Sequence, residues 1–393
     1  MRRIAVITQG FSGSTFPLEK RLVQRNVCVD HYQIVYQQVN DLESFPLKFK
    51  SRRYGMIDVI ESAAKEIYSF MNSERFSLKL INLPRPLVSI PVLRSIIRLL
   101  VYLILKKLCK TMNEKDYDEI LFIGLYNDRN FPVILKSVKT KKIVALHEVC
   151  NHANPNYDTP SLLLTILCRD NIPIIVFSEN SYNNILKYGM FSRENVYLMR
   201  FGLFEGYLLY KDDDTMNLPE EFILYIGSIS AYKGLDVLYD AVCKRNDWPC
   251  KFVVAGNGSL ESVNKMKKDS RFVVINRFLK NNEFAELIRK CKFVVCPYKS
   301  MSQSGIPQSV YVYDKPMIVS DLDGFKEIVD SDEGVMFESG NVNSLYDLIN
   351  SMLTNEIKCE IARERIRRKF DNENSFYSWN CIADEYVRLF NSL

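Results

Sequence analysis

The chain has 393 residues, of which 47% are apolar and 25% charged, and its formal net charge is +5. A single hydrophobic core seldom grows beyond about 250–300 residues, so this length predicts two domains. The mild positive charge does not by itself indicate nucleic-acid binding, but it suits an anionic ligand or an anionic membrane surface. No apolar run approaches the roughly 20 residues that a membrane-spanning helix needs, and the N-terminus resembles a strand rather than a signal peptide.

The ten cysteines form no CxxC pair and show no zinc-finger spacing. We therefore expect reduced thiols, a cytoplasmic protein and no bound metal.

Short apolar strands alternate with helical segments through the first half of the chain. This alternation is typical of a mostly parallel, doubly wound α/β sheet. The expected helices include Met56–Met71 and Ser181–Tyr188. The expected strands are Ile4–Thr8, Gln33–Tyr36, Leu78–Ile81, Glu119–Ile123, Lys142–Leu146, Ile174–Phe177 and Val196–Met199.

Two loops of the first half follow expected strands and carry candidate functional residues. The loop after the first strand contains Gly10, Ser12 and Gly13, which lack the GxGxxG spacing of a dinucleotide site and are candidates for acceptor contact. A flexible turn is the alternative. His147 and His152 follow another strand, and we favour a hydrogen bond to a sugar for His147, whereas His152 is balanced between an acceptor-side role and a structural one. His31 is expected to be structural.

Two further segments combine basic and apolar residues. They are the stretch Phe45–Tyr54 and the expected helix from Val92 to Lys110. Both could dock on anionic lipid, and a core helix with a solvated basic edge is an equally good interpretation of the second.

A polar segment at residues 211–221 has no apolar period, and we interpret it as an interdomain linker. It separates an N-terminal domain at residues 1–210 from a C-terminal domain at residues 218–375.

A second alternation of strands and helices follows this linker. Its expected strands are Phe222–Ile226, Lys251–Ala255, Phe272–Ile275, Phe293–Cys296, Met317–Ser320 and Gly334–Phe337, and its expected helices are Gly234–Lys244, Leu260–Lys268, Asn282–Lys290, Gly305–Tyr313, Val342–Leu353 and Ile357–Lys369.

Three loops of the second half follow expected strands, where open α/β sheets bind ligands. The first contains Gly227 and Lys233 ahead of a helix. Helix starts already favour anions, so a cation there suggests a ligand with several negative charges. The second loop contains Gly256 and Asn257, and its glycine leaves room for a ligand.

The third of these loops opens a helix at Ser304, Gly305 and Ile306. The backbone amides of these residues are expected to form an anion nest. Together with Lys233, they could hold a diphosphate.

The second half resembles the family-4-type (group 1) retaining glycosyltransferases of the GT-B fold. The segments that carry the resemblance come in the family's order and spacing, and they are Gly227 with Tyr232-Lys233-Gly234-Leu235, Ala255-Gly256-Asn257-Gly258, Lys315–Asp321 and Gly324–Val329. The resemblance is strong over about residues 222–340 and looser over the first half. It implies two Rossmann-like domains facing a cleft, with a last helix in residues 376–393 that packs back on the first domain.

The resemblance also implies an activity. A glycosyl group would pass from a UDP- or GDP-linked sugar to a hydroxyl of a glycan or lipid-linked glycan, with the anomeric configuration retained and without a metal. His147-Glu148 is similar to the family's His-Asp segment near the donor sugar, so His147, Glu148 and Lys233 are the catalytic candidates. The donor-binding candidates are Gly227, Ser228, Lys233, Gly256, Asn257, Arg277, Phe278, Ser304, Gly305, Ile306 and Ser309.

The chain departs from the family pattern at three positions. Ser228 stands where the family usually has arginine, and Met301 and Ser309 stand where it has two glutamates. Ser302-Gln303-Ser304-Gly305 resembles a variant branch in which the Ser-Gly turn still serves the phosphates. We expect a glycosyltransferase of surface polysaccharide, capsule, lipopolysaccharide or glycolipid assembly, cytoplasmic or peripheral on the inner face of the cell membrane. The alternatives are a nucleotide-sugar epimerase and a non-catalytic GT-B partner subunit.

Overall fold

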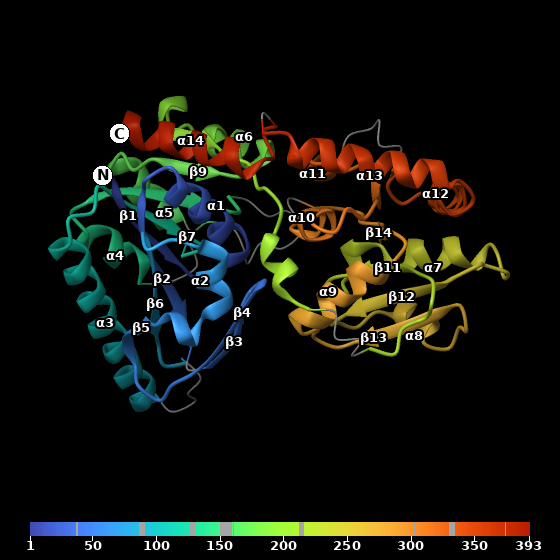
Figure 1. Cartoon of the computed structure of the whole chain (residues 1–393), viewed down its shortest axis with the longest axis horizontal. Coiled ribbons are helices and arrows are strands. Elements are labelled where there is room, and N and C mark those ends of the chain that lie inside the picture. The colour runs from blue at the N-terminus through green and yellow to red at the C-terminus, as the bar shows by residue number, and fades with distance from the viewer. Residues whose placement is uncertain are drawn as a thin grey trace. The chain divides into compact units, whose positions relative to one another are not determined.

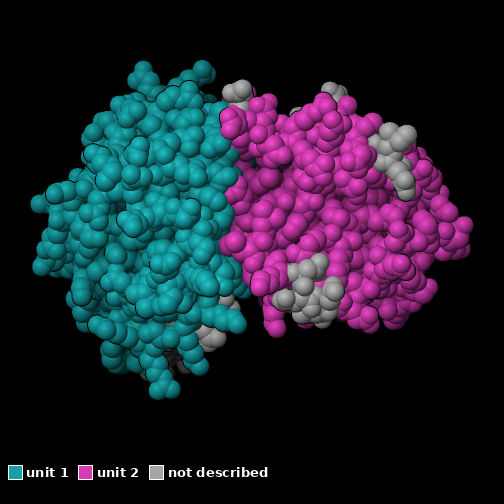
Figure 2. Space-filling model, viewed as in Figure 1, with its two compact units in different colours: residues 1–201, 379–393 teal, residues 202–378 magenta. Residues whose placement is uncertain are grey.

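The structure is a computed structural model that describes residues 1–36, 38–85, 91–125, 130–149, 159, 161–211, 216–301, 304–329, 335–373 and 375–393. It contains two compact units, coloured separately in Figure 2. Unit 1 comprises Met1–Phe201 and Trp379–Leu393, and unit 2 comprises Gly202–Ser378. The last helix thus returns to the first unit, as expected. The division falls before the expected boundary at residue 210.

Unit 1 is built on an eight-stranded sheet (Figure 1). Its order is β10-β9-β8-β7-β1-β2-β6-β5, and all neighbours are parallel except β5 and β6. Strands β1 and β7 in the middle of the sheet are almost entirely buried, because helices cover a parallel sheet on both sides. The strands are β1 (Arg3–Thr8), β2 (Cys28–Val35), β5 (Gly55–Val59), β6 (Phe76–Asn82), β7 (Glu119–Ile123), β8 (Lys141–Leu146), β9 (Ile174–Val176) and β10 (Val196–Leu198), and a separate hairpin contains β3 (Gln38–Leu42) and β4 (Phe45–Lys50).

Seven α-helices accompany this sheet in the described residues. They are α1 (Ser12–Gln24), α2 (Lys65–Met71), α3 (Pro91–Glu114), α4 (Phe131–Ser137), α5 (Ser161–Arg169), α6 (Glu179–Lys187) and α14 (Trp379–Ser392). The C-terminal helix α14 packs against α1. Arg25, just after α1, bonds Asp384 at 2.5 Å and the carbonyl of Asn380 at 3.0 Å. These contacts fix the end of the chain on unit 1.

Two expectations for unit 1 are wrong. The segment predicted as one helix, Met56–Met71, contains the strand β5 and the shorter helix α2. The start of the segment alternates β-branched and polar residues, and pairing with β6 overrides its helical period. The basic aromatic stretch Phe45–Tyr54 includes strand β4, and Phe45 and Leu47 are buried in the core rather than available to lipid.

Unit 2 is built on a parallel six-stranded sheet of order β13-β12-β11-β14-β15-β16. Its strands are β11 (Phe222–Ile226), β12 (Lys251–Gly256), β13 (Phe272–Asn276), β14 (Val294–Cys296), β15 (Met317–Ser320) and β16 (Met336–Phe337). Its α-helices are α7 (Leu235–Cys243), α8 (Glu261–Met266), α9 (Asn281–Lys290), α10 (Ile306–Tyr311), α11 (Asp323–Lys326), α12 (Val342–Thr354) and α13 (Glu356–Asp371). The doubly wound α/β class predicted for both halves is confirmed.

The start of unit 2 lies before the predicted linker for a packing reason. The short 3₁₀ segment η4 (Glu205–Leu209) contacts α9, and the ring of Tyr207 stacks on Phe284 at 4.8 Å. The carbonyl of Tyr207 also accepts the hydroxyl of Tyr313 at 2.7 Å. Residues 202–210 therefore belong to the second unit, although their sequence follows directly from the last strand of the first.

The longest helix, α3, has 24 residues. Across the part of the chain that the structure describes, no helix combines the length and the apolar composition that crossing a bilayer requires.

Candidate functional site

The topology of unit 2 singles out the loops that follow β11 and β14. Strand β11 lies in the middle of the sheet, with β12 on one side and β14 on the other. The strand order reverses here, because β12 and β13 extend to one side of β11, and β14, β15 and β16 extend to the other. A doubly wound sheet binds ligands at the carboxyl ends of its strands, beside such a switch point. The three predicted loops of the second half follow β11, β12 and β14.

The loops after β11 and β12 touch through their glycines. A Cβ placed on Gly256 would lie 1.7 Å from the carbonyl oxygen of Gly227, so no side chain fits there. The next residues continue the contact, because the amide of Ile229 donates to the carbonyl of Asn257 at 2.9 Å. A Cβ on Gly258 would in turn meet the carbonyl of Ile229 at 2.1 Å. Gly256 and Gly258 are therefore required by close backbone packing.

The loops after β11 and β14 are joined in the same way. Gly234, which adopts a φ of 66°, would place a Cβ 1.7 Å from the carbonyl oxygen of Pro297. The amide of Lys299 donates to the carbonyl of Tyr232 at 2.7 Å, and its ammonium group pairs with Asp236 at 2.5 Å. The structure thus brings together the three loops that the sequence predicted to form one site.

Lys233 lies where these loops meet. It ends the 3₁₀ segment η5 (Ala231–Lys233), directly before Gly234 and helix α7. Its ammonium nitrogen lies 3.6 Å from the ring centroid of Tyr298 and 5.0 Å from that of Tyr232. The residue is only 8% exposed, and burial lowers its pKa to about 8. Within the described residues no carboxylate pairs with it.

Such an ammonium group is stabilised by aromatic faces rather than by a counter-ion. An anion bound beside this ammonium group would stabilise the charged form of the lysine, which burial disfavours.

Tyr298 and Tyr225 are buried beside Lys233, and neither was among the predicted residues. The hydroxyl of Tyr225 donates to the carbonyl of Ser228 at 2.7 Å and fixes the turn after β11. Tyr298 is fully buried, with its hydroxyl 4.0 Å from where a Cβ of Gly227 would lie. Burial raises the pKa of both phenols, so both stay neutral beside Lys233.

The predicted anion nest is corrected in part. Ser304 is buried, and its hydroxyl accepts the amide of Ile306 at 3.3 Å, so this amide is not available to a phosphate. The side chain of Ser309 is also engaged, because its hydroxyl donates to the carbonyl of Gly305 at 2.9 Å. Gly305 itself is exposed at the start of α10. Its amide remains the candidate donor of this loop.

The other donor-binding candidates are Ser228 and Asn257, in the loops after β11 and β12, and Arg277 and Phe278, in the loop after β13. Ser228 and Asn257 are exposed. Arg277 and Phe278 follow β13, and Arg277 makes a bidentate ion pair with Glu283 at 2.7 and 2.8 Å. Phe278 is 83% exposed, which is unusual for an aromatic side chain. It offers a free ring face for stacking.

In unit 1 the loop after β1 is closed by a carboxylate that the sequence analysis missed. Glu43, in the turn between β3 and β4, accepts the amides of Phe11 and Gly13 at the start of α1. Ser12 and Gly13 are buried, and a Cβ on Gly10 would meet the same carboxylate at 3.2 Å. The amide of Gly13 is therefore already bonded, and it is not available to an acceptor. The contact joins residues distant in sequence, and no local pattern announces it.

His147 lies at the end of β8 in a stack of aromatic rings. Its imidazole is 3.5 Å from the ring of Phe11, 4.6 Å from Phe177 and 5.2 Å from Phe201, measured between ring centroids. Gly124, after β7, makes room for this stack, because a Cβ there would lie 2.4 Å from the Phe11 ring.

Burial lowers the pKa of His147 to about 3, so the ring is neutral at physiological pH. Its Nε2 is buried and has no hydrogen-bond partner among the described residues. A neutral imidazole supplies no positive charge to a ligand. A hydrogen bond to a neutral ligand is compatible with the geometry.

The remaining histidine predictions divide. His152 lies outside the described residues. His31 is buried within β2, where its Nδ1 lies 2.7 Å from Glu19 and its Nε2 3.2 Å from Thr8, as a structural histidine would be. Glu148 is partly buried, directly after His147, and its carbonyl accepts the hydroxyl of Thr159.

Solved structures match the chain over its full length. The sucrose-phosphate synthase of Thermosynechococcus elongatus is 16% identical, with a TM-score of 0.64 over 100% of this chain and 99% of its own. The Anabaena protein HepE, solved in complex with UDP and glucose, is 13% identical, with a TM-score of 0.64 over 100% of both chains. The chain has the GT-B fold. At these identities the likeness concerns the fold alone.

Sequence comparisons agree over part of this GT-B chain. The family described as Glycosyl transferases group 1 matches residues 220–355. An uncharacterized glycosyltransferase of Methanocaldococcus jannaschii is 30% identical over 158 residues, which cover 38% of this chain and 41% of the relative. The O-antigen chain mannosyltransferase C of Escherichia coli is 25% identical over 181 residues, covering 44% and 47%. The matches span less than half the length of these relatives.

The family match covers the loops of unit 2 that contain Gly227, Lys233 and Gly256, and also Gly305. In this GT-B chain, the strongest resemblance and the convergent loops therefore occupy the same unit.

Proposed function

We propose that the chain is a glycosyltransferase that moves a sugar from a nucleoside diphosphate to an acceptor hydroxyl. The reaction retains the anomeric configuration, needs no metal and uses no cofactor other than the UDP- or GDP-linked donor. The match of residues 220–355 to Glycosyl transferases group 1 supports the activity. The HepE complex with UDP and glucose, which has the same fold, supports the class of donor.

The observation that carries the proposal is the environment of Lys233. A buried ammonium group without a carboxylate partner in the described residues is costly unless a ligand supplies the negative charge. In the transition state of glycosyl transfer, negative charge grows on the leaving diphosphate. A cation already fixed in place lowers that barrier without reorganisation.

The surrounding residues complete a binding site for the donor. The amide of Gly305 donates to a phosphate oxygen, and Gly227, whose Cβ position meets only the Tyr298 hydroxyl at 4.0 Å, lets the diphosphate approach the backbone. The exposed ring of Phe278 stacks on the base, with Arg277 held beside it by Glu283. Asn257 and Ser228 supply further polar contacts on the rim.

We assign the contacts with the transferred sugar to His147 and Glu148. The neutral imidazole of His147 has an unsatisfied Nε2 in the described structure, which suits a hydrogen bond to a sugar hydroxyl. We propose a hexosyl donor and a role in surface polysaccharide or glycolipid assembly at the cytoplasmic side of a membrane. The likeness to an O-antigen chain mannosyltransferase supports this assignment.

The test is a transfer assay on the purified full chain. UDP- and GDP-linked hexoses are offered with membrane lipid extract as acceptor, and release of the nucleoside diphosphate is measured. We expect release with one donor and, by NMR of the product, retention at the anomeric carbon. Donor binding without release would favour the non-catalytic alternative, and isotope exchange at the sugar ring without acceptor would favour the epimerase.

Two matched variants connect the assay to the site. Lys233→Met removes the buried ammonium group, and we expect transfer to fall by a factor of about 100 to 1,000. Lys299→Met removes a half-exposed lysine of the adjoining loop, which is already paired with Asp236. The control is expected to retain most of the activity. Equal losses in the two variants would contradict the assignment of Lys233.

A further inference from the structure

Helix α3 presents a row of apolar side chains to the solvent. Val92 is 70% exposed, Ile96 57%, Leu99 59% and Leu103 52%. Single exposed apolar residues are ordinary on a protein surface, but a continuous row marks an interaction site. These four residues are separated by four, three and four positions, so they lie on one side of the helix.

The opposite side of the same helix faces the core of unit 1. Ile104, Leu108 and Met112 are buried there, together with Leu105 and Cys109. At 100° per residue, the exposed row points about 180° away from these side chains. The core therefore accounts for only one of the two apolar faces of α3, and the second has a separate explanation.

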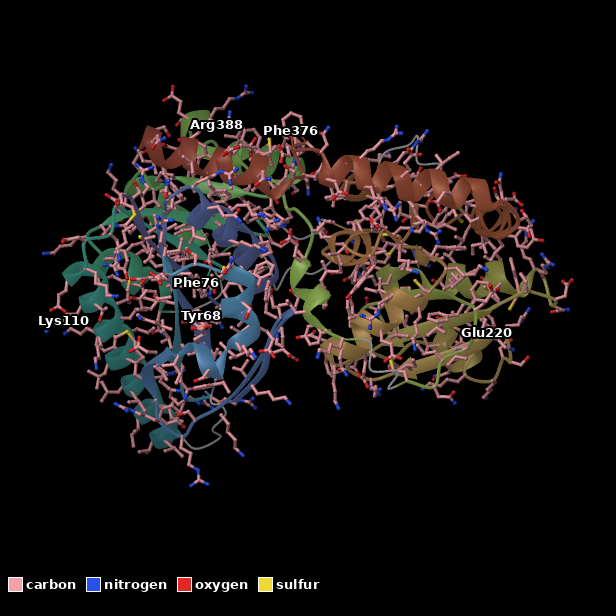
Figure 3. The ribbon with its side chains drawn as sticks, in the orientation of Figure 1. Tyr68, Phe76, Lys110, Glu220, Phe376 and Arg388 are labelled. Atoms are coloured by element: carbon pink, nitrogen blue, oxygen red, sulfur yellow. The ribbon has the colours of Figure 1, made fainter. Side chains whose placement is uncertain are left out.

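The exposed row continues into lysines toward the end of the helix. Lys106, Lys107 and Lys110 follow on the same side, and all three are exposed. The side chain of Lys110, labelled in Figure 3, is 73% exposed and lies 3.5 Å from Glu114 one turn later. We define Val92, Ile96, Leu99, Leu103, Lys106, Lys107 and Lys110 as the outer face of α3. Its first half is apolar and its second half is basic.

We propose that the outer face of α3 docks on an anionic lipid bilayer. Apolar side chains can enter the boundary between headgroups and acyl chains, while lysines reach up to the phosphates. The helix is not apolar enough to cross a bilayer, so it lies along the surface. The three lysines provide the charge complementarity that favours anionic over neutral lipid. The proposal stands on unit 1 alone and does not depend on the proposed transferase activity.

The test is flotation of the full chain with lipid vesicles in the absence of any sugar donor. Vesicles of phosphatidylcholine alone are compared with vesicles that also contain phosphatidylglycerol, at low and high NaCl. We expect the chain to bind vesicles that contain phosphatidylglycerol. Binding is expected to be at least about tenfold weaker to vesicles of phosphatidylcholine alone, or at high NaCl. Equal binding to both kinds of vesicle, or binding to neither, would overturn the proposal.

Two variants identify the surface that binds. The triple variant Ile96→Ser, Leu99→Ser, Leu103→Ser removes the apolar row, and Lys106→Glu, Lys107→Glu, Lys110→Glu reverses the charge. Each is expected to reduce vesicle binding at least about tenfold while the thermal unfolding curve stays close to that of the wild type. Unchanged vesicle binding in either variant would refute the assignment to α3.

The chain offers a matched charge control. Lys265, Lys267 and Lys268 are three exposed lysines near α8 in unit 2, and Lys265 pairs with Glu261 as Lys110 pairs with Glu114. Reversal of these three charges changes the net charge by the same amount and is expected to leave vesicle binding intact. A second copy of the chain is the competing occupant. A dimer that the triple serine variant dissociates, with no vesicle binding by the wild type, would replace the lipid proposal.

Discussion

The charge of Lys233 makes a quantitative prediction for nucleotide binding. The pKa of this buried lysine is lowered to about 8, so about nine-tenths of the free protein is protonated at pH 7 and about one-tenth at pH 9. A bound diphosphate favours the protonated form and raises the pKa again. Binding therefore takes up a proton as pH rises through about 8, and the affinity for UDP or GDP is expected to fall about tenfold between pH 7 and pH 9.

The neighbouring groups do not titrate in this window. The Cys296 thiol lies close to Lys233, and burial raises its pKa to about 12. Burial likewise raises the pKa of Tyr225 and of Tyr298. The nearest ion pair of the adjoining loop, Lys299 with Asp236, is partly exposed. The expected slope is thus that of one group.

Isothermal titration calorimetry measures this effect directly. Titrations of UDP and GDP at pH 7, 8 and 9, in buffers of different ionisation enthalpy, give the affinity and the number of protons taken up. Lys233→Arg keeps its charge at all three pH values and is expected to give a flat profile. Lys233→Met is expected to bind weakly and without proton uptake. A flat wild-type profile, or tight binding by Lys233→Met, would refute the reasoning.

Three further predictions follow from individual contacts. Gly256→Ala would place a Cβ 1.7 Å from the carbonyl oxygen of Gly227, and we expect it to lower the free energy of unfolding in urea by about 3 kcal/mol or more. The control Gly340→Ala, whose added Cβ meets no atom within 4 Å, is expected to lower it by about 1 kcal/mol. Similar losses in the two variants would contradict the close packing of the two loops. His147→Phe keeps a neutral ring in the aromatic stack, so the free energy of unfolding should change by less than about 1.5 kcal/mol and the affinity for UDP should persist. The rate of sugar transfer is expected to fall about a hundredfold, because the variant lacks Nε2. Full activity would show that Nε2 has no part in transfer. Burial opposes ionisation of Asp30, but hydrogen bonds from Ser77, Tyr117 and Lys115 outweigh burial and lower the pKa of Asp30 to about 2. The wild type should therefore lose about 2 kcal/mol of unfolding free energy between about pH 4 and pH 2, and Asp30→Asn should not show this loss. Parallel acid-unfolding curves of the two proteins would argue against this linkage.

The sequence determined the architecture of unit 2 and the loops of its candidate site. Short apolar strands such as Phe222–Ile226 are specified by local composition. The glycines at 234 and 256 mark close turns, because only glycine leaves the space that the neighbouring backbone occupies. Since parallel strands end at one edge of a sheet, loops that follow them converge, and the position of Lys233 could be deduced from this rule.

Tertiary structure alone decided the details that depend on distant partners. Glu43 accepts the amides at the start of α1, the ring of Tyr298 in the loop after β14 lies 3.6 Å from the ammonium nitrogen of Lys233, and Phe11 stacks on His147. The pairing of β5 with β6 likewise overrode a helical pattern at Met56. Local sequence sets propensity and turn geometry, but burial, ring stacking and the capture of a free amide depend on which segments meet, and that is fixed only when the whole core packs.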